Sequence, residues 1–188
     1  MNNLQVVKKW LISLGSPPLF FEWASKLLFW FYPVSFLLLF TGLIWGIGFA
    51  PPDYKQGEVY RIIFIHVPSA IIGQSVYLMM AFFGSICLIW RAKLAGMFLR
   101  SAAPLGASFT LIALVSGAVW GKPTWGTWWV WDARLTSMLI LLILYIIYIS
   151  IWKWVKDFDR ANKASSVIAI IALLNLPIIK YSVDWWNT

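Results

Sequence analysis

The sequence predicts an all-α fold, a polytopic transmembrane helical bundle, and its composition is the first reason. Of its 188 residues, 61% are hydrophobic and only 12% are charged, and the mean hydropathy is +0.78. Soluble domains carry about 25% charged residues. The second reason is the presence of uncharged runs long enough to cross a bilayer, which requires about 20 apolar residues per helix. An ordinary soluble domain is therefore excluded.

Five apolar runs organise the chain as a single transmembrane domain, residues 1–188. Pro51 and Pro52 end the first run, and His66-Val67-Pro68 begins the second. Proline is tolerated in the first turn of a helix, because its missing N–H has no partner there. The segment from Phe20 to Lys26 suits an amphipathic stretch at the membrane surface. The expected spans are approximately 28–49, 66–90, 101–119, 135–152 and 164–180.

The basic residues orient these five spans, because the side of a membrane protein that is richer in Lys and Arg faces the cytoplasm. One set of alternate segments holds ten of the 15 basic residues: Lys8, Lys9, Lys26, Arg91, Lys93, Arg100, Lys153, Lys156, Arg160 and Lys163. The other set holds five: Lys55, Arg61, Lys122, Arg134 and Lys180. We therefore expect His66 and segment 120–134 at the outer face. The net charge of +8 reflects basic residues that set which loops lie on which side of the membrane, and no nucleic-acid partner is expected.

Segment 120–134 is the most unusual stretch of the chain, with five tryptophans within twelve residues. If a helix begins after Pro123, then four side chains stand at positions i, i+3, i+4 and i+7 on one face: Trp125, Trp128, Trp129 and Asp132. Such a face has two uses. It is either an aromatic belt at the membrane–water interface, or a flat platform for a large planar ligand. The residues alone leave both open.

His66 is the only histidine in the sequence. Neutral imidazole is a common metal ligand and a usual axial ligand of haem iron. One histidine cannot build a zinc site, which needs three or four protein ligands, but it can complete a porphyrin that already supplies four nitrogens. The alternative is a hydrogen-bonded structural histidine. The single cysteine, Cys87, lies in an apolar run, which predicts a small buried hydrophobic residue and excludes a disulfide framework.

Three segments carry a resemblance to a known family. Segment 120–132, Trp-Gly-Lys-Pro-Thr-Trp-Gly-Thr-Trp-Trp-Val-Trp-Asp, resembles the WWD motif of the haem-handling proteins of cytochrome c maturation. Within that group, Arg-Ile-Ile-Phe-Ile-His-Val-Pro at 61–68 and Asn-Leu-Pro-Ile-Ile-Lys-Tyr-Ser-Val-Asp-Trp-Trp-Asn-Thr at 175–188 are similar to the CcmC family, haem exporter protein C of the system I pathway.

The resemblance implies a function that the composition does not show. CcmC proteins hold haem at the outer, periplasmic face of the inner membrane and promote its attachment to the haem chaperone CcmE. They work beside CcmD and the ABC-type subunits CcmA and CcmB. The cofactor implied is haem b, transiently bound, and the implied localisation is the cell inner membrane, or the mitochondrial inner membrane for an organellar source.

By match of position, the resemblance also assigns site residues. His66 corresponds to an axial ligand of the haem iron. The motif residues that would bind haem are Trp120, Trp125, Trp128, Trp129, Trp131 and Asp132. In the family a second axial histidine and a sixth span follow the Trp-Trp-Asn-Thr stretch. Both are absent before Thr188, so we expect a C-terminally truncated form.

Three outer-face cations, Arg61, Lys122 and Arg134, are candidates for pairing with the haem propionates, since arginine suits bidentate binding of carboxylates. A role as solvated loop cations is the alternative. We expect no enzymatic activity. The competing functions are a haem-containing membrane oxidoreductase subunit and a transporter whose tryptophans form only an interfacial belt. A single histidine argues against the first, and the scarcity of ionisable residues within the spans argues against the second.

Overall fold

The computed structural model describes the backbone of residues 16–186 and the side chains of residues 16–182, and every regular element within that range is a helix. The predicted all-α class is therefore confirmed. In chain order the elements are α2 (Pro17–Leu43), η1 (Ile44–Phe49), η2 (Glu58–Ile62), α3 (Ile63–Trp90), α4 (Lys93–Trp125), α5 (Ala133–Trp154), α6 (Phe158–Ile171), η3 (Ala172–Leu174) and α7 (Asn175–Trp186). Within the described range, five helical segments are long and apolar enough to cross a membrane: Pro17–Phe49, Glu58–Trp90, Lys93–Trp125, Ala133–Trp154 and Phe158–Ser182.

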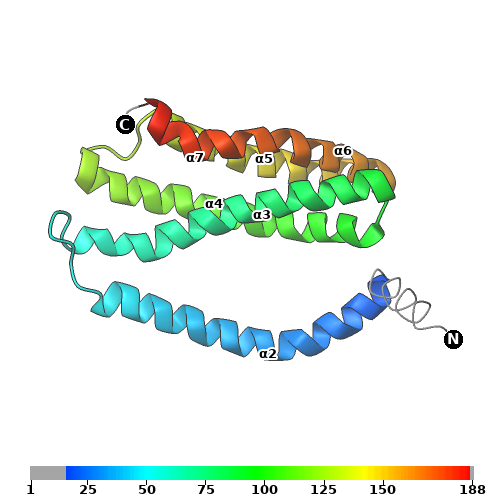
Figure 1. The fold of residues 1–188 in the computed structure, drawn as a ribbon, viewed down its shortest axis with the longest axis horizontal. Coiled ribbons are helices and arrows are strands. Elements are labelled where there is room, and N and C mark those ends of the chain that lie inside the picture. Colours follow the sequence, from blue (N-terminus) through cyan, green and yellow to red (C-terminus); the bar gives the residue numbers. More distant parts are fainter. Residues whose placement is uncertain (1–15, 187–188) are drawn as a thin grey trace.

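The last four of these segments form a bundle, and α2 lies to one side of it (Figure 1). Within the bundle α3 packs most extensively against α4 and then against α6, while α5 packs against α4 and α7. No residue of α2 is buried. The first span meets the bundle through η1, where buried Gly46 lies against the ring of Phe64 and the guanidinium of Arg61 donates a hydrogen bond to the carbonyl oxygen of Ile47 at 2.9 Å.

One end of the bundle gathers the segments with unusual chemistry. Loop 50–57, the C-terminal end of α4, the connection 126–132 and the C-terminal end of α7 all lie at the left end in Figure 1. The two other connections, 91–92 and 155–157, lie at the opposite end. The alternation of helices thus brings the start of α3, with His66, close to the tryptophan segment. Their position at the outer membrane face stays a prediction from the basic residues.

One local expectation at the helix starts was wrong. Pro68 does not lie in the first turn of its helix, because the 3-10 segment η2 leads directly into α3 at Ile63. Pro68 therefore lies inside α3, where its missing N–H leaves the carbonyl of Phe64 without a helical donor. The segment from Phe20 to Lys26 is helical and forms the first part of α2, which begins at Pro17. Its position at the membrane surface stays a prediction.

Glycines and a buried tyrosine set the close approach of α3, α4 and α5. A Cβ atom at Gly73 would lie 2.6 Å from the hydroxyl of Thr110, and one at Gly106 would overlap the hydroxyl of Tyr145. The Tyr145 side chain is fully buried and donates a hydrogen bond to the carbonyl oxygen of Gly73 at 2.7 Å, which joins α5 to α3. Cys87 is buried among apolar neighbours, as the sequence predicts.

Gly106 offers a test of this packing. We expect Gly106→Ala to lower the thermal unfolding temperature in detergent, because overpacking a tight interior contact costs about 1–3 kcal/mol and the fully buried ring of Tyr145 must move. Gly42→Ala is the matched control, since a Cβ atom at that helical position meets nothing within 4 Å. Equal melting temperatures for the two variants would contradict the close α4–α5 contact.

Candidate functional site

The imidazole of His66 lies between α3 and α4, and its hydrogen bonds define its protonation. Its Nδ1 is 3.0 Å from the carbonyl oxygen of Ala113 and 3.1 Å from the hydroxyl oxygen of Ser116. A carbonyl oxygen only accepts, so Nδ1 is the donor, and in the neutral imidazole the lone pair then lies on Nε2. Nε2 has no hydrogen-bond partner among the described residues. A histidine that donates its other ring N–H to a carbonyl is the arrangement that proteins use to orient metal ligands.

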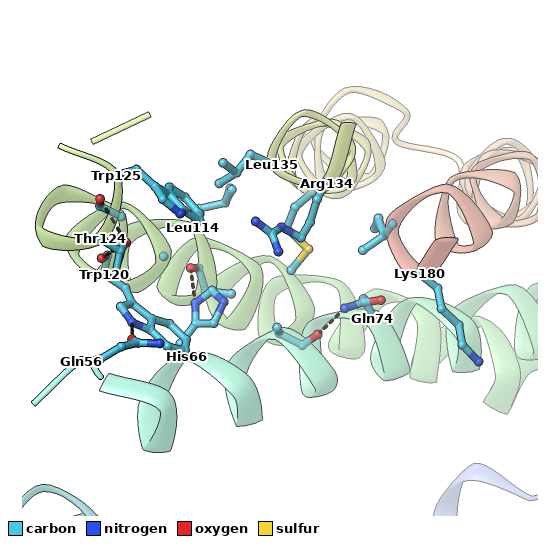
Figure 2. Close-up of a pocket in the computed structure, with 16 residues that line it drawn as sticks. Gln56, His66, Gln74, Leu114, Trp120, Thr124, Trp125, Arg134, Leu135 and Lys180 are labelled. Atoms are coloured by element: carbon cyan, nitrogen blue, oxygen red, sulfur yellow. Dashed lines mark hydrogen bonds between the residues drawn. The ribbon is translucent and has the colours of Figure 1, made fainter. Parts of the chain in front are cut away.

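This histidine lines a cavity of about 630 Å³, within the size range of small-molecule and cofactor sites. The walls come from loop 50–57, α3, α4, α5 and α7, so four of the five membrane-spanning segments line the cavity. The lining residues include Gln56, His66, Gln74, Trp120, Thr124, Trp125, Arg134, Met138, Ile179 and Lys180 (Figure 2).

Trp120 packs directly against the histidine. The two rings meet edge to face, with 5.7 Å between their centroids and 77° between their planes. The indole N–H of Trp120 donates a hydrogen bond of 2.7 Å to the side-chain carbonyl of Gln56, which lies in the loop before α3. Close packing at this point requires Gly117, because a Cβ atom there would be 2.9 Å from Cε1 of His66.

The predicted helix starting after Pro123 is wrong. Helix α4 continues through Pro123 to Trp125 and ends at Gly126, whose positive φ of 77° lets its N–H bond to the carbonyl of Lys122 at 3.0 Å. Residues 126–132 are not helical. The next helix, α5, begins only after Asp132. The four side chains expected on one helical face therefore lie on a helix end, an irregular segment and a helix cap.

The cavity lining brings together three of the seven predicted site residues: His66, Trp120 and Trp125. Trp128 and Trp131 are 57% and 75% exposed and do not line it. Trp129 is partly buried against the core, and its indole N–H is buried without an acceptor among the described residues. The haem-binding roles of all seven residues stay predictions.

Asp132, the seventh predicted residue, has a structural contact that explains its burial. Its carboxylate accepts a hydrogen bond of 2.7 Å from the backbone N–H of Leu135 and thereby caps the N-terminus of α5. The second carboxylate oxygen is 3.6 Å from the guanidinium of Arg134. That guanidinium also lies over the ring of Trp125, 5.6 Å from the ring centroid.

The three candidate cations separate in the structure. Only Arg134 lines the cavity. Arg61 pairs with Glu58 at 3.0 Å, and the ammonium of Lys122 donates to the carbonyl oxygen of Gly126 at 3.0 Å. Lys180, which the sequence analysis did not assign to the site, reaches the cavity from α7 on the side opposite Trp120, and its amino group points outward (Figure 2). Its signal in the sequence was a lone cation at the end of an apolar span.

Other lining residues were missed, among them Gln56, Gln74 and Met138. No local sequence signal marks these three, because tertiary packing alone brings them to the cavity. Thr124 also lines the cavity and lies within the motif at 120–132. The tail of the resemblance, from Val183 to Thr188, lies outside the residues whose side chains the structure describes.

Comparison with known proteins places this arrangement in a family. The family model described as "CcmC: Heme exporter protein C" matches residues 10–188. The chain is 49% identical over 180 residues to "Heme exporter protein C" of Escherichia coli (strain K12). These aligned residues cover 96% of this chain and 74% of that protein. The chain belongs to the CcmC family. Proteins of the same name from Haemophilus influenzae and Bradyrhizobium diazoefficiens are 43% and 44% identical, over 96% and 95% of this chain and 73% and 67% of their own lengths.

In this CcmC-family chain, the capping role of Asp132 can be separated from any role toward a ligand. We expect Asp132→Ala to lower the free energy of unfolding by about 1 kcal/mol, because the first turn of α5 loses its N-cap acceptor. Asp132→Ser should retain the stability, since a serine hydroxyl caps equally well. Circular dichroism melting in detergent measures both variants. If Ala and Ser lower stability equally, the cap is not what the carboxylate contributes.

Proposed function

We propose that this chain binds haem as its cargo in the His66 cavity and delivers it to the haem chaperone CcmE for cytochrome c maturation. The observation that carries the proposal is the state of His66, an imidazole with Nδ1–H bonded to the Ala113 carbonyl and Nε2 unengaged at a cavity wall. The names of the relatives support haem as the cargo, since they are called heme exporter proteins. The partners CcmE, CcmD, CcmA and CcmB are proposed from the resemblance.

The residues present fit a haem in three respects. Nε2 of His66 supplies a neutral nitrogen ligand for the iron. The indole rings of Trp120 and Trp125 supply apolar aromatic wall for the porphyrin. Arg134 supplies a guanidinium for a propionate carboxylate. Of the two cations in the lining, Arg134 is the stronger candidate because Lys180 directs its amino group away from the cavity (Figure 2).

The exposure of the tryptophan segment supports release rather than storage. Trp125 lines the cavity yet is half exposed, and Trp128 and Trp131 lie still more open beside it. A cargo held at this edge keeps one side accessible to a second protein. In this role the chain carries and presents haem, and we assign it no catalytic residue.

Absorption spectroscopy tests the axial ligand. We expect the detergent-purified chain, expressed with haem supply, to show a Soret band that His66→Ala abolishes or shifts, because the variant removes the proposed iron ligand. Adding imidazole to His66→Ala should restore the band in part. Ser85→Ala is the control, since Ser85 lies in the same helix as His66, donates its hydroxyl to the carbonyl oxygen of Ala81 at 3.0 Å and does not line the cavity. A wild-type chain without a Soret band, or His66→Ala with an unchanged one, would overturn the haem site.

We further propose that the site faces the periplasm across a bacterial inner membrane. The proposal is supported by the ten basic residues assigned to the other side against five on this one. Loop 50–57 and the connection 126–132 lie at the same end of the bundle (Figure 1), so both would lie on the same side of the membrane.

Single-cysteine labelling checks this orientation. Cys87 is buried, so Cys87→Ala provides a background without an accessible thiol. In that background we expect Tyr54→Cys, at the 89% exposed tip of loop 50–57, to react with a membrane-impermeant maleimide in intact spheroplasts. Lys156→Cys, exposed at the opposite end, should react only after the membrane is opened. The reverse pattern would place the cavity on the cytoplasmic side.

A further inference from the structure

The loop that precedes α3 is held in one conformation by its own hydrogen bonds. The carboxylate of Asp53 accepts from the backbone N–H of Lys55 at 2.9 Å and of Gln56 at 2.8 Å. The backbones of Asp53 and Gly57 exchange two further hydrogen bonds, and Gly57 has a positive φ of 60°. The N–H groups of Gln56 and Lys55 hold the pKa of Asp53 below its usual value, so the carboxylate is ionised at neutral pH. The backbone of Gln56 is thus fixed.

From this fixed loop the side chain of Gln56 reaches α4. Its carbonyl oxygen accepts the 2.7 Å hydrogen bond from the indole N–H of Trp120, a residue 64 positions later in the chain. In Figure 2 Gln56, Trp120 and His66 lie side by side at one end of the cavity. The edge of the cavity at His66 is therefore bounded by a ring that a loop residue holds in place.

Gln56 also lies between two cavities. Both Gln56 and Thr124 line the His66 cavity and a second cavity of about 310 Å³, whose other walls are Lys55, Val59 and Pro123. The second cavity lies on the loop side. Gln56 thus lies at the boundary between the two cavities, and its hydrogen bond to Trp120 connects that boundary to the histidine site.

We propose that Gln56 is a positioning residue of the histidine site: its side-chain carbonyl holds the indole of Trp120 against His66 and closes the wall between the two cavities. Gln56 acts through Trp120, and the inference rests on haem being the ligand of the site. Loss of the hydrogen bond frees the indole to turn, which opens the site to the loop side and loosens the packing around the imidazole.

The test compares four variants of the full 188-residue chain loaded with haem: Gln56→Ala, Gln56→Glu, Trp120→Phe and the double variant Gln56→Ala/Trp120→Phe. The readouts are the Soret maximum and the rate of haem transfer to excess apomyoglobin. We expect Gln56→Ala and Trp120→Phe each to shift the Soret maximum and to speed haem release by about three- to tenfold, the range of one neutral hydrogen bond. The double variant should release haem no faster than the faster single variant, because both changes remove the same interaction.

The conservative variant and the control make the test specific. Gln56→Glu keeps an acceptor oxygen for the indole N–H and should retain the wild-type spectrum and release rate. Ser85→Ala should also behave as wild type, since its hydroxyl donates to the carbonyl oxygen of Ala81 within α3 at 3.0 Å and Ser85 does not line the cavity. Additive effects in the double variant, or a Gln56→Glu variant as fast as Gln56→Ala, would overturn the positioning role.

Failure of this inference is distinguishable from failure of the proposed function. A wild-type chain that holds no haem, or a His66→Ala variant with wild-type spectrum, contradicts the haem site itself. A wild-type chain whose Soret band depends on His66, combined with Gln56→Ala indistinguishable from Ser85→Ala, contradicts only the role of Gln56.

Discussion

The close approach of α3 and α4 is the constraint on which the histidine site depends. Gly73 allows α3 to lie against Thr110, and Gly117 leaves room for the imidazole of His66 on the opposite helix. Only at this separation does Nδ1 of His66 reach the carbonyl of Ala113, which fixes the tautomer and leaves Nε2 available. The chemistry of the site therefore follows from small residues that carry no chemistry themselves.

The side chains at and beside the site come from helical segments and from irregular chain. His66 lies inside a membrane-spanning helix and is held by backbone and hydroxyl oxygens of its neighbour. Trp120 belongs to the last turns of α4, and Trp125 to its end. Beyond Gly126 the tryptophans occupy irregular chain, where Trp128 and Trp131 are exposed. The arrangement changes from hydrogen-bonded and partly buried at the histidine to exposed at the edge, which suits the proposed role of holding haem and then releasing it.

Much of the fold could be predicted from the sequence, because uncharged runs indicate membrane-spanning helices and basic residues indicate the loops between them. The tryptophan segment was harder. Its spacing of i, i+3, i+4 and i+7 matched a helical face, and Pro123 suggested a helix start. The stop at Gly126 and the cap at Asp132 were visible in the sequence as a glycine and an aspartate, and they decide the local structure. The helix-end signals at Gly126 and Asp132 therefore outweigh the periodicity of the tryptophan side chains.

The site itself could be predicted only in part for a different reason. His66 and Trp120 were found because their residue types are distinctive, whereas Gln56 and Met138 reach the cavity through tertiary packing that no local pattern encodes. Local contacts instead engage two of the candidate cations: Arg61 pairs with Glu58, three residues earlier, and Lys122 donates to the carbonyl oxygen of Gly126, four residues later. Residue type predicts candidate ligands, and the topology determines which residues share one cavity.

The separation of α2 from the bundle has a consequence for assembly in the membrane. Because α2 buries no residue and the first span meets the bundle mainly at η1, the described chain leaves most of the apolar surface of α2 uncovered. The other four spans pack against one another around buried glycines such as Gly73 and Gly106. The packing of the bundle therefore depends little on the side chains of α2.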